Sequence, residues 1–447
     1  MGKRQLGIGR NLRKRQKTED ASSSEKKDAS GSKESTDAAQ EEYITVPLEE
    51  EADPEDPTSQ LCALWKTWLD SDRDSELLLN GIINECDRLV RLADKASKAN
   101  KGSTVDSKPE VYAIFGMSLA ELAKFHTEDT TAGNTVKDYF DNAVERIELG
   151  EARKPENGII RLAHASVDLS RIPLEYISKM DLNSTGKAFP DIEKLLDKAL
   201  EEYLSGYKLI KADKEQGKAF KQRWILEIFD TLDDLIDIVR SFGEDHNEQI
   251  DSDEEEELEE GEARIHGKKA VGKRHPLYKL IVEIEKDDNK YGAFFEEQLS
   301  NFLKATSASE KASAADKELQ QGAESKFGLW LLAKAARPTR IYSELEFGEE
   351  KTDEKAKQEE KQARSEGIKI LEEAIEHLKV AWNEEIPSTW VDLAEAKISL
   401  GNMYEESSKE QDKLYEEAAK YLRKANNATH GKYQEILDSL VDGAESD

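Results

Sequence analysis

Two segments near the end of the chain, 390–404 and 414–425, carry apolar and small residues at spacings of three and four. Residues at these spacings share one face of an α-helix, so each segment predicts a helix with one packed face. Small side chains on that face let two antiparallel helices approach closely, and larger ones fill the gaps between turns. One such pair cannot bury its apolar face alone, so we expect neighbouring pairs to stack on it. The residues that define the face are Leu400, Gly401, Tyr404, Ala418, Tyr421 and Ala425.

The pattern L-G-x-x-Y followed by Y-E-E-A-x-x-Y-x-x-x-A is similar to the helix pair of a tetratricopeptide repeat (TPR). Related but less regular patterns occur at 109–150, 157–210 and 216–242, and 370–382 resembles a second repeat helix. The linking turn at 125–137 is longer than usual for such a repeat. We therefore predict an all-α fold, an irregular TPR-like helical-repeat array (an α-solenoid).

Changes in composition divide the chain into segments. Order is expected to begin at Thr58 or Ser59, either of which is a plausible N-cap for a first helix. The Ala/Ser/Lys-rich stretch between Leu303 and Phe327 predicts a loop with weak helix. The predicted segments are 1–58 (disordered basic tail and linker), 59–243 (first helical half), 244–275 (disordered acidic and basic loop), 276–441 (second helical half) and 442–447 (acidic tail).

The predicted loop has an acidic core at 251–262. Between 244 and 262 there are twelve acidic residues and no Lys or Arg, and such a run repels itself and stays disordered. One interpretation is an inserted surface loop whose acidic half and following basic half neutralise each other. The other is a docking site for a basic partner, tuned by phosphorylation of Ser252, which stands before further acids.

The composition excludes several classes of protein. A formal net charge of -31 argues against direct nucleic-acid binding across the surface. The two cysteines, Cys62 and Cys86, form no C-x-x-C pair, which argues against a disulfide framework or a zinc site. Cys86 is expected to be a small core residue. No apolar run approaches the roughly 18 residues that would span a bilayer, and the basic N-terminus lacks the apolar region of a secretory signal. We therefore expect a soluble, intracellular protein, and we expect it to be a monomer.

The first seventeen residues hold seven Lys or Arg and no acid, in an otherwise acidic chain. Two basic clusters around a short spacer resemble a nuclear-localisation signal that an import receptor reads. The competing interpretation is a solvated basic tail with no receptor. The residues of the two clusters that we assign to nuclear import are Lys3, Arg4, Arg13, Lys14, Arg15 and Lys17.

No pattern in the sequence indicates catalysis. The seven histidines are scattered, without H-E-x-x-H spacing, and there is no Gly-rich phosphate loop after a strand and no G-x-S-x-G elbow. The acidic pair Asp233 and Asp237 is read as a solvated helix face rather than a metal site, because no His is near it in the sequence. We therefore expect a non-enzyme without catalytic residues, cofactor or metal.

Helical arrays usually present a groove to an extended or helical segment of another protein. The candidate groove residues are Trp330, Trp382 and Trp390 in the second half of the chain. The alternative is that these three tryptophans belong to the core, since large aromatics at helical spacing usually do.

The N-terminal run Lys3-Arg4-Gln5-Leu6-Gly7-Ile8-Gly9, a following basic cluster, a linker and TPR-like helices together resemble the fungal enhancer of translation termination family. That family includes the negative regulator of a prolyl-hydroxylase-like oxygenase. The resemblance implies a non-catalytic nuclear adaptor that binds a 2-oxoglutarate- and iron-dependent oxygenase. Such an adaptor would regulate hypoxic gene expression and promote correct translation termination, and the iron ligands would belong to the oxygenase.

The competing hypothesis is a TPR-type histone chaperone with an acidic tract. It would account for the net charge, the nuclear signal, the helix pairs and the segment 251–262 together. Against it, the acidic run falls between helix pairs rather than inside one repeat.

Overall fold

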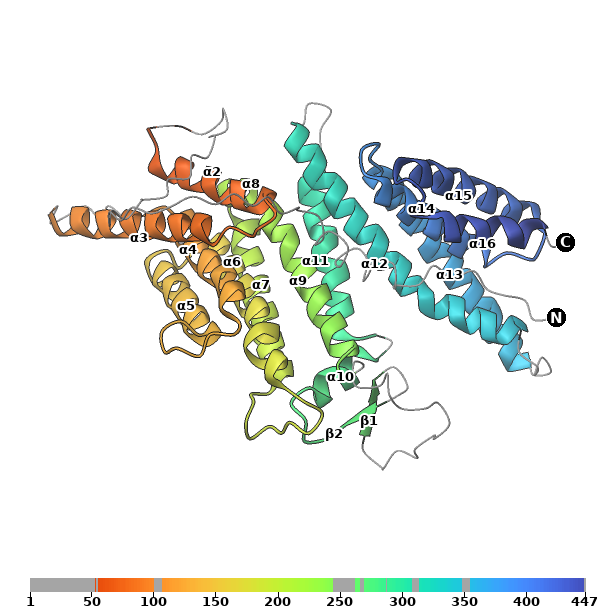
Figure 1. Cartoon of the computed structure of the whole chain (residues 1–447), viewed down its shortest axis with the longest axis horizontal. Helices are drawn as coiled ribbons and strands as arrows, with labels where there is room; N and C mark the ends of the chain where they lie inside the picture. The colour runs from red at the N-terminus through yellow and green to blue at the C-terminus, as the bar shows by residue number, and fades with distance from the viewer. Residues whose placement is uncertain are drawn as a thin grey trace, which may run out of the picture. The chain divides into compact units, whose positions relative to one another are not determined.

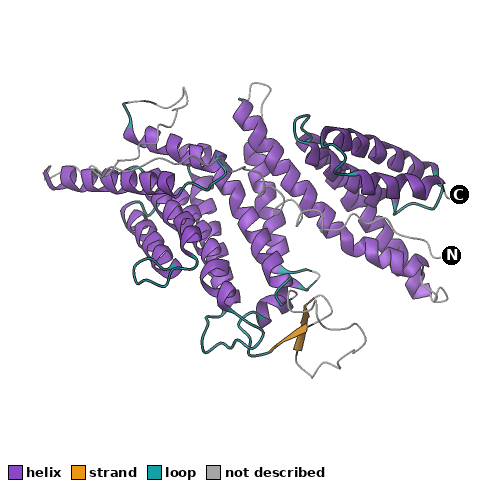
Figure 2. Ribbon diagram, viewed as in Figure 1, coloured by secondary structure: helices purple, strands orange, loops and turns teal. Residues whose placement is uncertain are grey.

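The computed structural model of the chain is built almost entirely of helices (Figure 2). Its described residues are 53, 55–99, 107–243, 262–265, 269–286, 288–307, 313–347 and 354–445. They form two compact units, an N-terminal unit within Glu41–Ala305 and a C-terminal unit within Thr306–Asp447. The predicted all-α helical array is confirmed. The sequence analysis divided the helices at the loop 244–275, whereas the compact units divide at residue 306.

The N-terminal unit runs from α2 to α11 (Figure 1). Short 3-10 and π turns follow α4 and α6, and a two-stranded hairpin precedes α10. The elements are α2 (Pro57–Asp70), α3 (Glu76–Ala99), α4 (Pro109–Leu122), α5 (Val136–Arg153), α6 (Gly158–Arg171), α7 (Ile192–Ala212), α8 (Lys214–Ala219), α9 (Arg223–Arg240), β1 (Glu262–Ile265), β2 (Lys269–Gly272), α10 (Tyr278–Ile284) and α11 (Lys290–Thr306).

The helix α2 begins two residues before the predicted start. Asp56 is its N-cap, and the Asp56 carboxylate accepts a hydrogen bond from the Thr58 amide at 3.0 Å. Pro57 stands at the first helical position, where its missing N–H costs nothing. Thr58 and Ser59, the predicted caps, therefore lie inside the helix, because the Asp-Pro pair supplies a better start signal just before them.

Two pairs of consecutive helices in this unit, α4–α5 and α6–α7, pack through glycines. At the α6–α7 contact, a methyl group added to Gly206 would lie 2.8 Å from the carbonyl oxygen of Gly158. The start of α6 thus touches the end of α7 backbone to backbone. In the α4–α5 pair, a methyl group on Gly116 would instead meet the Ile147 side chain at 2.4 Å. Only glycine permits helix axes this close.

Aromatic rings fill the space between α7, α9 and α11. The Tyr203 ring lies 5.8 Å from Phe229 and 5.3 Å from Phe294 between centroids, and Phe229 lies 5.6 Å from Phe295. All three pairs are edge-on, the arrangement that ring quadrupoles favour. This cluster joins helices that are about ninety residues apart in the sequence, so it is a long-range part of the core.

The hairpin of β1 and β2 lies inside 244–275, which the sequence analysis predicted to be disordered. The strands pair antiparallel, with Glu262 opposite Gly272. The chain after β2 is tied to the loop before α7, since the Gly186 amide donates to the Arg274 carbonyl at 3.1 Å and the His275 Nε2 lies 2.9 Å from the Asp181 carbonyl oxygen. The acidic core 251–262, except Glu262, lies outside the described residues.

The C-terminal unit is formed by α12 (Ala314–Phe347), α13 (Glu354–Ala381), α14 (Pro387–Gly401), α15 (Lys409–Ala428) and α16 (Gln434–Glu445). The helix α12 begins inside the stretch predicted to be a loop with weak helix, and it continues through Pro338. A proline inside a helix costs about 3 kcal/mol or more. Pro338 is buried and lies in contact distance of Gly367 on α13. Packing between these two long helices therefore stabilises α12 at the point where the proline removes a backbone hydrogen bond. The helix α16 extends into the segment 442–447, predicted to be an acidic tail.

The predicted contact between α14 and α15 is confirmed. A methyl group on Gly401 would lie 2.5 Å from the Tyr415 ring, and Ala418 and Ala425 are completely buried. Leu400 belongs to an apolar cluster that α12, α13 and α14 share, and Tyr404 and Tyr421 pack against that cluster. The two helices therefore stack on their neighbours, as the sequence pattern required.

The α6–α7 contact gives a first prediction. Gly206→Ala should lower the free energy of unfolding by about 1–3 kcal/mol, the usual cost of overpacking, because the added methyl group meets a backbone carbonyl that cannot rotate away. Chemical denaturation of the full chain measures the change.

The matched control is Gly81→Ala in the exposed interior of α3, where an added methyl group meets no atom within 4 Å. This change should raise the free energy of unfolding by up to about 1 kcal/mol through helix propensity. Similar effects of the two substitutions would contradict the close packing of α6 on α7.

Candidate functional site

A cleft of about 280 Å³ opens in the N-terminal unit between α2, α4, α6 and α9. The sequence analysis did not predict it. Its lining combines apolar and charged side chains with those of Ser166, Ser170 and Thr231. The apolar residues are Trp65, Leu69, Met117, Ala120, Val167 and Trp224. The charged residues are Arg73, Glu121, Lys124, Glu227, Asp230 and Asp234.

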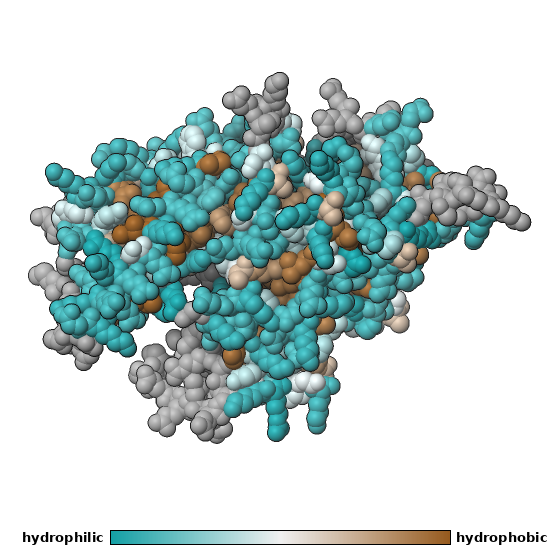
Figure 3. All heavy atoms as spheres, turned by 180° about the vertical axis from the view of Figure 1, so that it is seen from behind, coloured by the Kyte–Doolittle hydropathy of each residue, from teal (hydrophilic) through white to brown (hydrophobic). Residues whose placement is uncertain are grey.

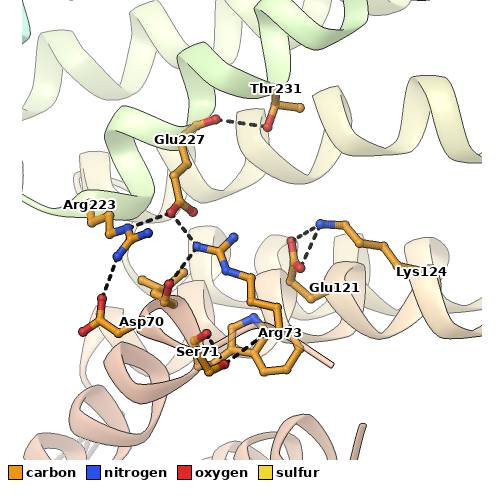
Figure 4. Close-up of polar contacts among 10 residues, drawn as sticks. Asp70, Ser71, Arg73, Glu121, Lys124, Arg223, Glu227 and Thr231 are labelled. Carbon is orange, nitrogen blue, oxygen red and sulfur yellow. Dashed lines mark hydrogen bonds and ion pairs between the residues drawn. The ribbon is translucent and has the colours of Figure 1, made fainter. Parts of the chain in front are cut away.

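An ionic network fixes one end of the cleft (Figure 4). The Arg73 guanidinium lies 2.5 Å from a Glu227 carboxylate oxygen, and Arg223 bonds to the same oxygen at 3.1 Å. Arg223 also reaches Asp70 at the end of α2, at 2.8 Å. Four side chains thus join the end of α2 and the turn after it to the start of α9, about 150 residues later. Because these groups are partly exposed, the network contributes more to position than to stability.

The backbone at Arg73 is left-handed, with a φ of 57°. This conformation is unfavourable for a residue with a Cβ, and local hydrogen bonds hold it. The Arg73 amide donates to the Ser71 hydroxyl, which in turn donates to the Trp68 carbonyl at 2.8 Å. The guanidinium also donates to the Leu69 carbonyl at 3.1 Å. These hydrogen bonds therefore fix the turn after α2 in the conformation that directs the Arg73 side chain toward Glu227.

The rim of the cleft carries more negative than positive charge. Four carboxylates face two cations, which gives a formal net charge of -2. Glu121 is paired with Lys124 on the same helix, with distances of 2.7 and 2.8 Å. Asp230 and Asp234 lie one turn apart on α9, and both are exposed. The side of the cleft formed by α9 is therefore its acidic edge.

A second polar cluster joins α5, α6 and α7. The ligand atoms of Glu151, His164 and Glu202 lie within 4.8 Å of one another, close enough to suggest a metal site. His164 Nδ1, however, is hydrogen-bonded to Glu151 at 3.1 Å, and Glu202 accepts from Arg161 at 3.1 Å. A neighbouring cation such as Arg161 opposes metal binding, so we assign the cluster to hydrogen bonding between the three helices.

His164 is almost completely buried and lies between two carboxylates, Glu151 at 3.1 Å and Asp168 at 3.9 Å. Burial by itself lowers the pKa of His164, because it disfavours the charged imidazolium. The hydrogen bond to Glu151 and the charges of Asp168 and Glu151 outweigh burial, so the pKa lies above the ordinary value of histidine. The folded protein thus favours protonated His164.

In the C-terminal unit, two of the three predicted groove residues lie together. The Lys424 ammonium is 4.8 Å from the Trp382 ring centroid and 4.4 Å from the Trp390 ring centroid. Trp390 is buried, and its indole N–H donates to the Asn383 carbonyl at 2.7 Å, whereas Trp382 is half-buried. The half-buried Trp330 lies on α12, outside the two apolar clusters described for this unit.

Several other predicted features fall elsewhere. The predicted nuclear-localisation residues, from Lys3 to Lys17, and the predicted phosphosite Ser252 lie outside the described residues. Cys86 is buried, as predicted, and burial raises its pKa. Burial also raises the pKa of Cys62 to about 11. None of the described helices is long and apolar enough to cross a membrane.

Comparison with known proteins gives matches over nearly the whole chain. A family model described as nuclear pore complex subunit Nro1 matches residues 1–441. Enhancer of translation termination 1 of Scheffersomyces stipitis is 36% identical over 470 residues, which cover 99% of this chain and 100% of the relative.

Two solved structures are also similar to this chain. The S. pombe nuclear import adaptor Nro1 has a TM-score of 0.48 at 16% identity, over 86% of this chain and 99% of the other. A structure of Nro1 described as a hypoxic regulator of sterol synthesis and a nuclear import adaptor has a TM-score of 0.47 at 16% identity, over 86% and 93%.

The His164 cluster predicts a pH-dependent stability. Because the folded state raises the pKa of His164, its stabilising effect is complete below the unfolded-state pKa of about 6.5. The effect is lost as the pH rises through the higher pKa of the folded state. We expect His164→Gln to lower the free energy of unfolding by about 1.5–3 kcal/mol in the acidic range, the value of a hydrogen bond to a charged group, and by less in the alkaline range.

Denaturant unfolding at about pH 5.5 and about pH 8.5, on either side of the histidine range, measures the difference. Glu151→Gln should remove much of the same pH dependence, since it takes away the carboxylate that holds the proton. A constant gap between wild type and His164→Gln at both pH values would contradict this role.

Proposed function

The chain belongs to the Nro1 family of nuclear pore complex subunits, and we propose from this premise that it is a nuclear adaptor. An adaptor in this sense binds a second protein and a nuclear import receptor without catalysing a reaction. The observation that carries the proposal is the extent of the match, which includes the basic N-terminal segment together with both helical units. The shared feature is therefore the combination of tail and helices, which suits a protein with two partners.

The N-terminal basic clusters would supply the contact with the import receptor. Their charge is isolated in a chain with a net charge of -31, and import receptors read such clusters of Lys and Arg. One solved relative is described as a nuclear import adaptor. We propose that Lys3, Arg4 and the cluster from Arg13 to Lys17 form this contact in the present chain.

The second partner is proposed to be a 2-oxoglutarate- and iron-dependent oxygenase of the prolyl-hydroxylase type, as the family resemblance implies. Through it, the chain would regulate hypoxic gene expression, and one relative is described as a hypoxic regulator of sterol synthesis. The curated relatives are named for translation termination, so we propose that the chain also promotes correct termination. The iron ligands would belong to the oxygenase, and the adaptor would act as a monomer without a cofactor.

The helical units offer apolar side chains for a protein contact. The molecular face drawn in Figure 3 is mainly hydrophilic, with hydrophobic patches between hydrophilic residues. Near Trp382 and Trp390, the side chains of Val380 and Ile386 are almost half exposed, at 49% and 47%. We propose that this surface of the C-terminal unit contributes to partner binding. Trp330 stays a candidate for the same role.

The import proposal predicts the behaviour of a tail variant in cells. Replacing Lys3, Arg4, Arg13, Lys14, Arg15 and Lys17 by Ala should abolish the nuclear accumulation of a fluorescent fusion, because it removes the positive charge that a receptor reads. The control replaces Lys3, Lys14 and Lys17 by Arg, which keeps the charge and should keep nuclear accumulation. Nuclear accumulation of the Ala variant would contradict the assignment.

Capture from a fungal nuclear extract tests the second partner. The full chain and a chain without 244–261, a deletion that spares the hairpin of β1 and β2, should both retain a 2-oxoglutarate oxygenase, identified by mass spectrometry at moderate salt, because the helices make the contact. Recovery of histones instead, lost on that deletion or at high salt, would favour the acidic TPR-type histone chaperone and overturn the adaptor proposal.

A further inference from the structure

His275 lies where several segments of the N-terminal unit meet. It follows β2, precedes α10, and contacts the loop 180–191 before α7 (Figure 1). The residue is almost completely buried, and its ring centroid lies 5.3 Å from that of Phe242, just after α9. Buried polar groups nearly always have hydrogen-bond partners, so the partners of the two ring nitrogens show which form of the imidazole this position accepts.

Both ring nitrogens of His275 have a backbone partner of fixed character. Nε2 lies 2.9 Å from the Asp181 carbonyl oxygen, which can only accept, so Nε2 carries a proton. Nδ1 lies 3.1 Å from the Leu277 amide nitrogen, which can only donate, so Nδ1 carries none. The contacts therefore fit one form of the ring, the neutral tautomer with its proton on Nε2.

Protonation of His275 would break one of these contacts. An imidazolium has an N–H on both nitrogens, so Nδ1–H would point at the N–H of Leu277. Because Leu277 is completely buried, its amide would lose its acceptor in a place that water does not reach, which costs about as much as a lost hydrogen bond. The bond from Nε2 to the Asp181 carbonyl can remain in either form of the ring.

The surroundings of the ring favour the neutral form. Burial lowers the pKa of His275 and is the largest effect, whereas the hydrogen bond to Asp181 and the charge of that residue raise it. The net result is a pKa below the ordinary value of histidine. The Asp181 carboxylate already accepts from the Asn183 amide at 2.9 Å and from the Ser184 hydroxyl at 3.1 Å.

The other charged side chains on the adjoining elements are exposed or already ion-paired. They are Lys187 on the loop, Arg240 with Asp237 on α9, Lys273 and Arg274 after β2, and Lys279 on α10 with Asp191 on the loop. Most of them are cations, which disfavour a further positive charge nearby.

Backbone contacts around His275 join the same segments. The Gly186 amide of the loop donates to the Arg274 carbonyl at 3.1 Å, and the His275 amide donates to the Gly272 carbonyl of β2 at 2.8 Å. At the end of α9, a methyl group added to Gly243 would lie 2.8 Å from the Leu182 side chain. The loop 180–191 therefore touches both described parts of the chain that flank the acidic segment 244–261.

We propose that His275 is a pH-sensitive latch within the N-terminal unit. In its neutral form it joins the loop 180–191 to the start of α10, and its protonation loosens these contacts. The parts of the chain that flank the acidic segment 244–261 are thus held together at neutral pH and loosened at acidic pH. The latch requires neither the import receptor nor the oxygenase, so it goes beyond the proposed adaptor function.

The direction of the pH effect follows from the lowered pKa of folded His275. Its stabilising effect is complete above the unfolded-state pKa of about 6.5, and it is lost as the pH falls through that value toward the lower pKa of the folded state. The effect of His164 has the opposite sign, since its pKa is raised in the folded protein. Acidic pH should therefore loosen the segments around His275 while it favours the contacts of His164.

Hydrogen exchange read by mass spectrometry tests the latch on the full chain at about pH 7.5 and about pH 5.5, on either side of the histidine pKa. Protection factors, corrected for the intrinsic effect of pH, are compared for peptides from 180–191 and 272–280. They should fall about three- to tenfold at the lower pH, because it lies about one unit below the pKa of a free histidine. Peptides from α6 are the internal reference and should keep their protection.

The variant His275→Gln separates titration from packing. Its amide keeps a donor and an acceptor but takes up no proton in this range, so protection around it should not depend on pH, whether the latch stays closed or opens. The matched control is His430→Gln, which removes an exposed histidine of the C-terminal unit and should leave the wild-type pH dependence unchanged.

Three results would overturn the proposal. The first is equal protection of the wild type at both pH values, and the second is a pH dependence that persists in His275→Gln. The third is an equal loss of protection in α6, which would indicate general loosening by acid. A chain without 244–261 should keep the pH dependence, and its loss there would assign the effect to the acidic segment instead of His275.

Discussion

The close approach of antiparallel helices at small residues is the constraint on which the rest of the structure depends. At Gly158 and Gly206 two helix backbones touch, and at Gly401 a helix backbone meets an aromatic ring. Such contacts fix both the distance and the register of a pair, because the helices fit closely only where the glycine lies. Larger side chains then pack on either side, as the edge-on rings of Tyr203 and Phe229 do. The face that each paired helix leaves exposed follows from these contacts.

Local sequence was sufficient to predict much of the fold. The helix pair at 390–425 could be predicted because its small and aromatic residues repeat at helical spacing within about 35 residues. The start of α12 was also encoded locally and was missed. Ser313 and Asp316 form reciprocal hydrogen bonds, the Ser313 hydroxyl accepting from the Asp316 amide at 3.1 Å and the Asp316 carboxylate accepting from the Ser313 amide at 3.2 Å. This S-x-x-D capping box was hidden in an Ala/Ser/Lys stretch that looked like a loop.

The cleft could not be predicted from the sequence, because no local pattern contains it. Trp65 and Trp224 have the helical spacing of core residues within their own segments, and both are indeed buried. The contact between Arg73 and Glu227 joins positions 154 residues apart, and it depends on a left-handed backbone at Arg73 that only the folded turn defines. Asp230 and Asp234 were part of a helix face read as solvated. Only the packing of α2, α4 and α6 on α9 separates these two residues from Asp233 and Asp237.

The helix α9 shows how such a face can persist. Its four aspartates from Asp230 to Asp237 form two like-charged pairs at i, i+4 spacing, each of which disfavours the helix by about 0.2–0.5 kcal/mol. The opposite face buries large apolar side chains, and full burial of one of them contributes about 1.5–3 kcal/mol. Those residues include Ile225, Phe229, Leu232, Leu235, Ile236 and Val239. Packing therefore exceeds the repulsion severalfold, so α9 carries four aspartates without losing its place in the fold.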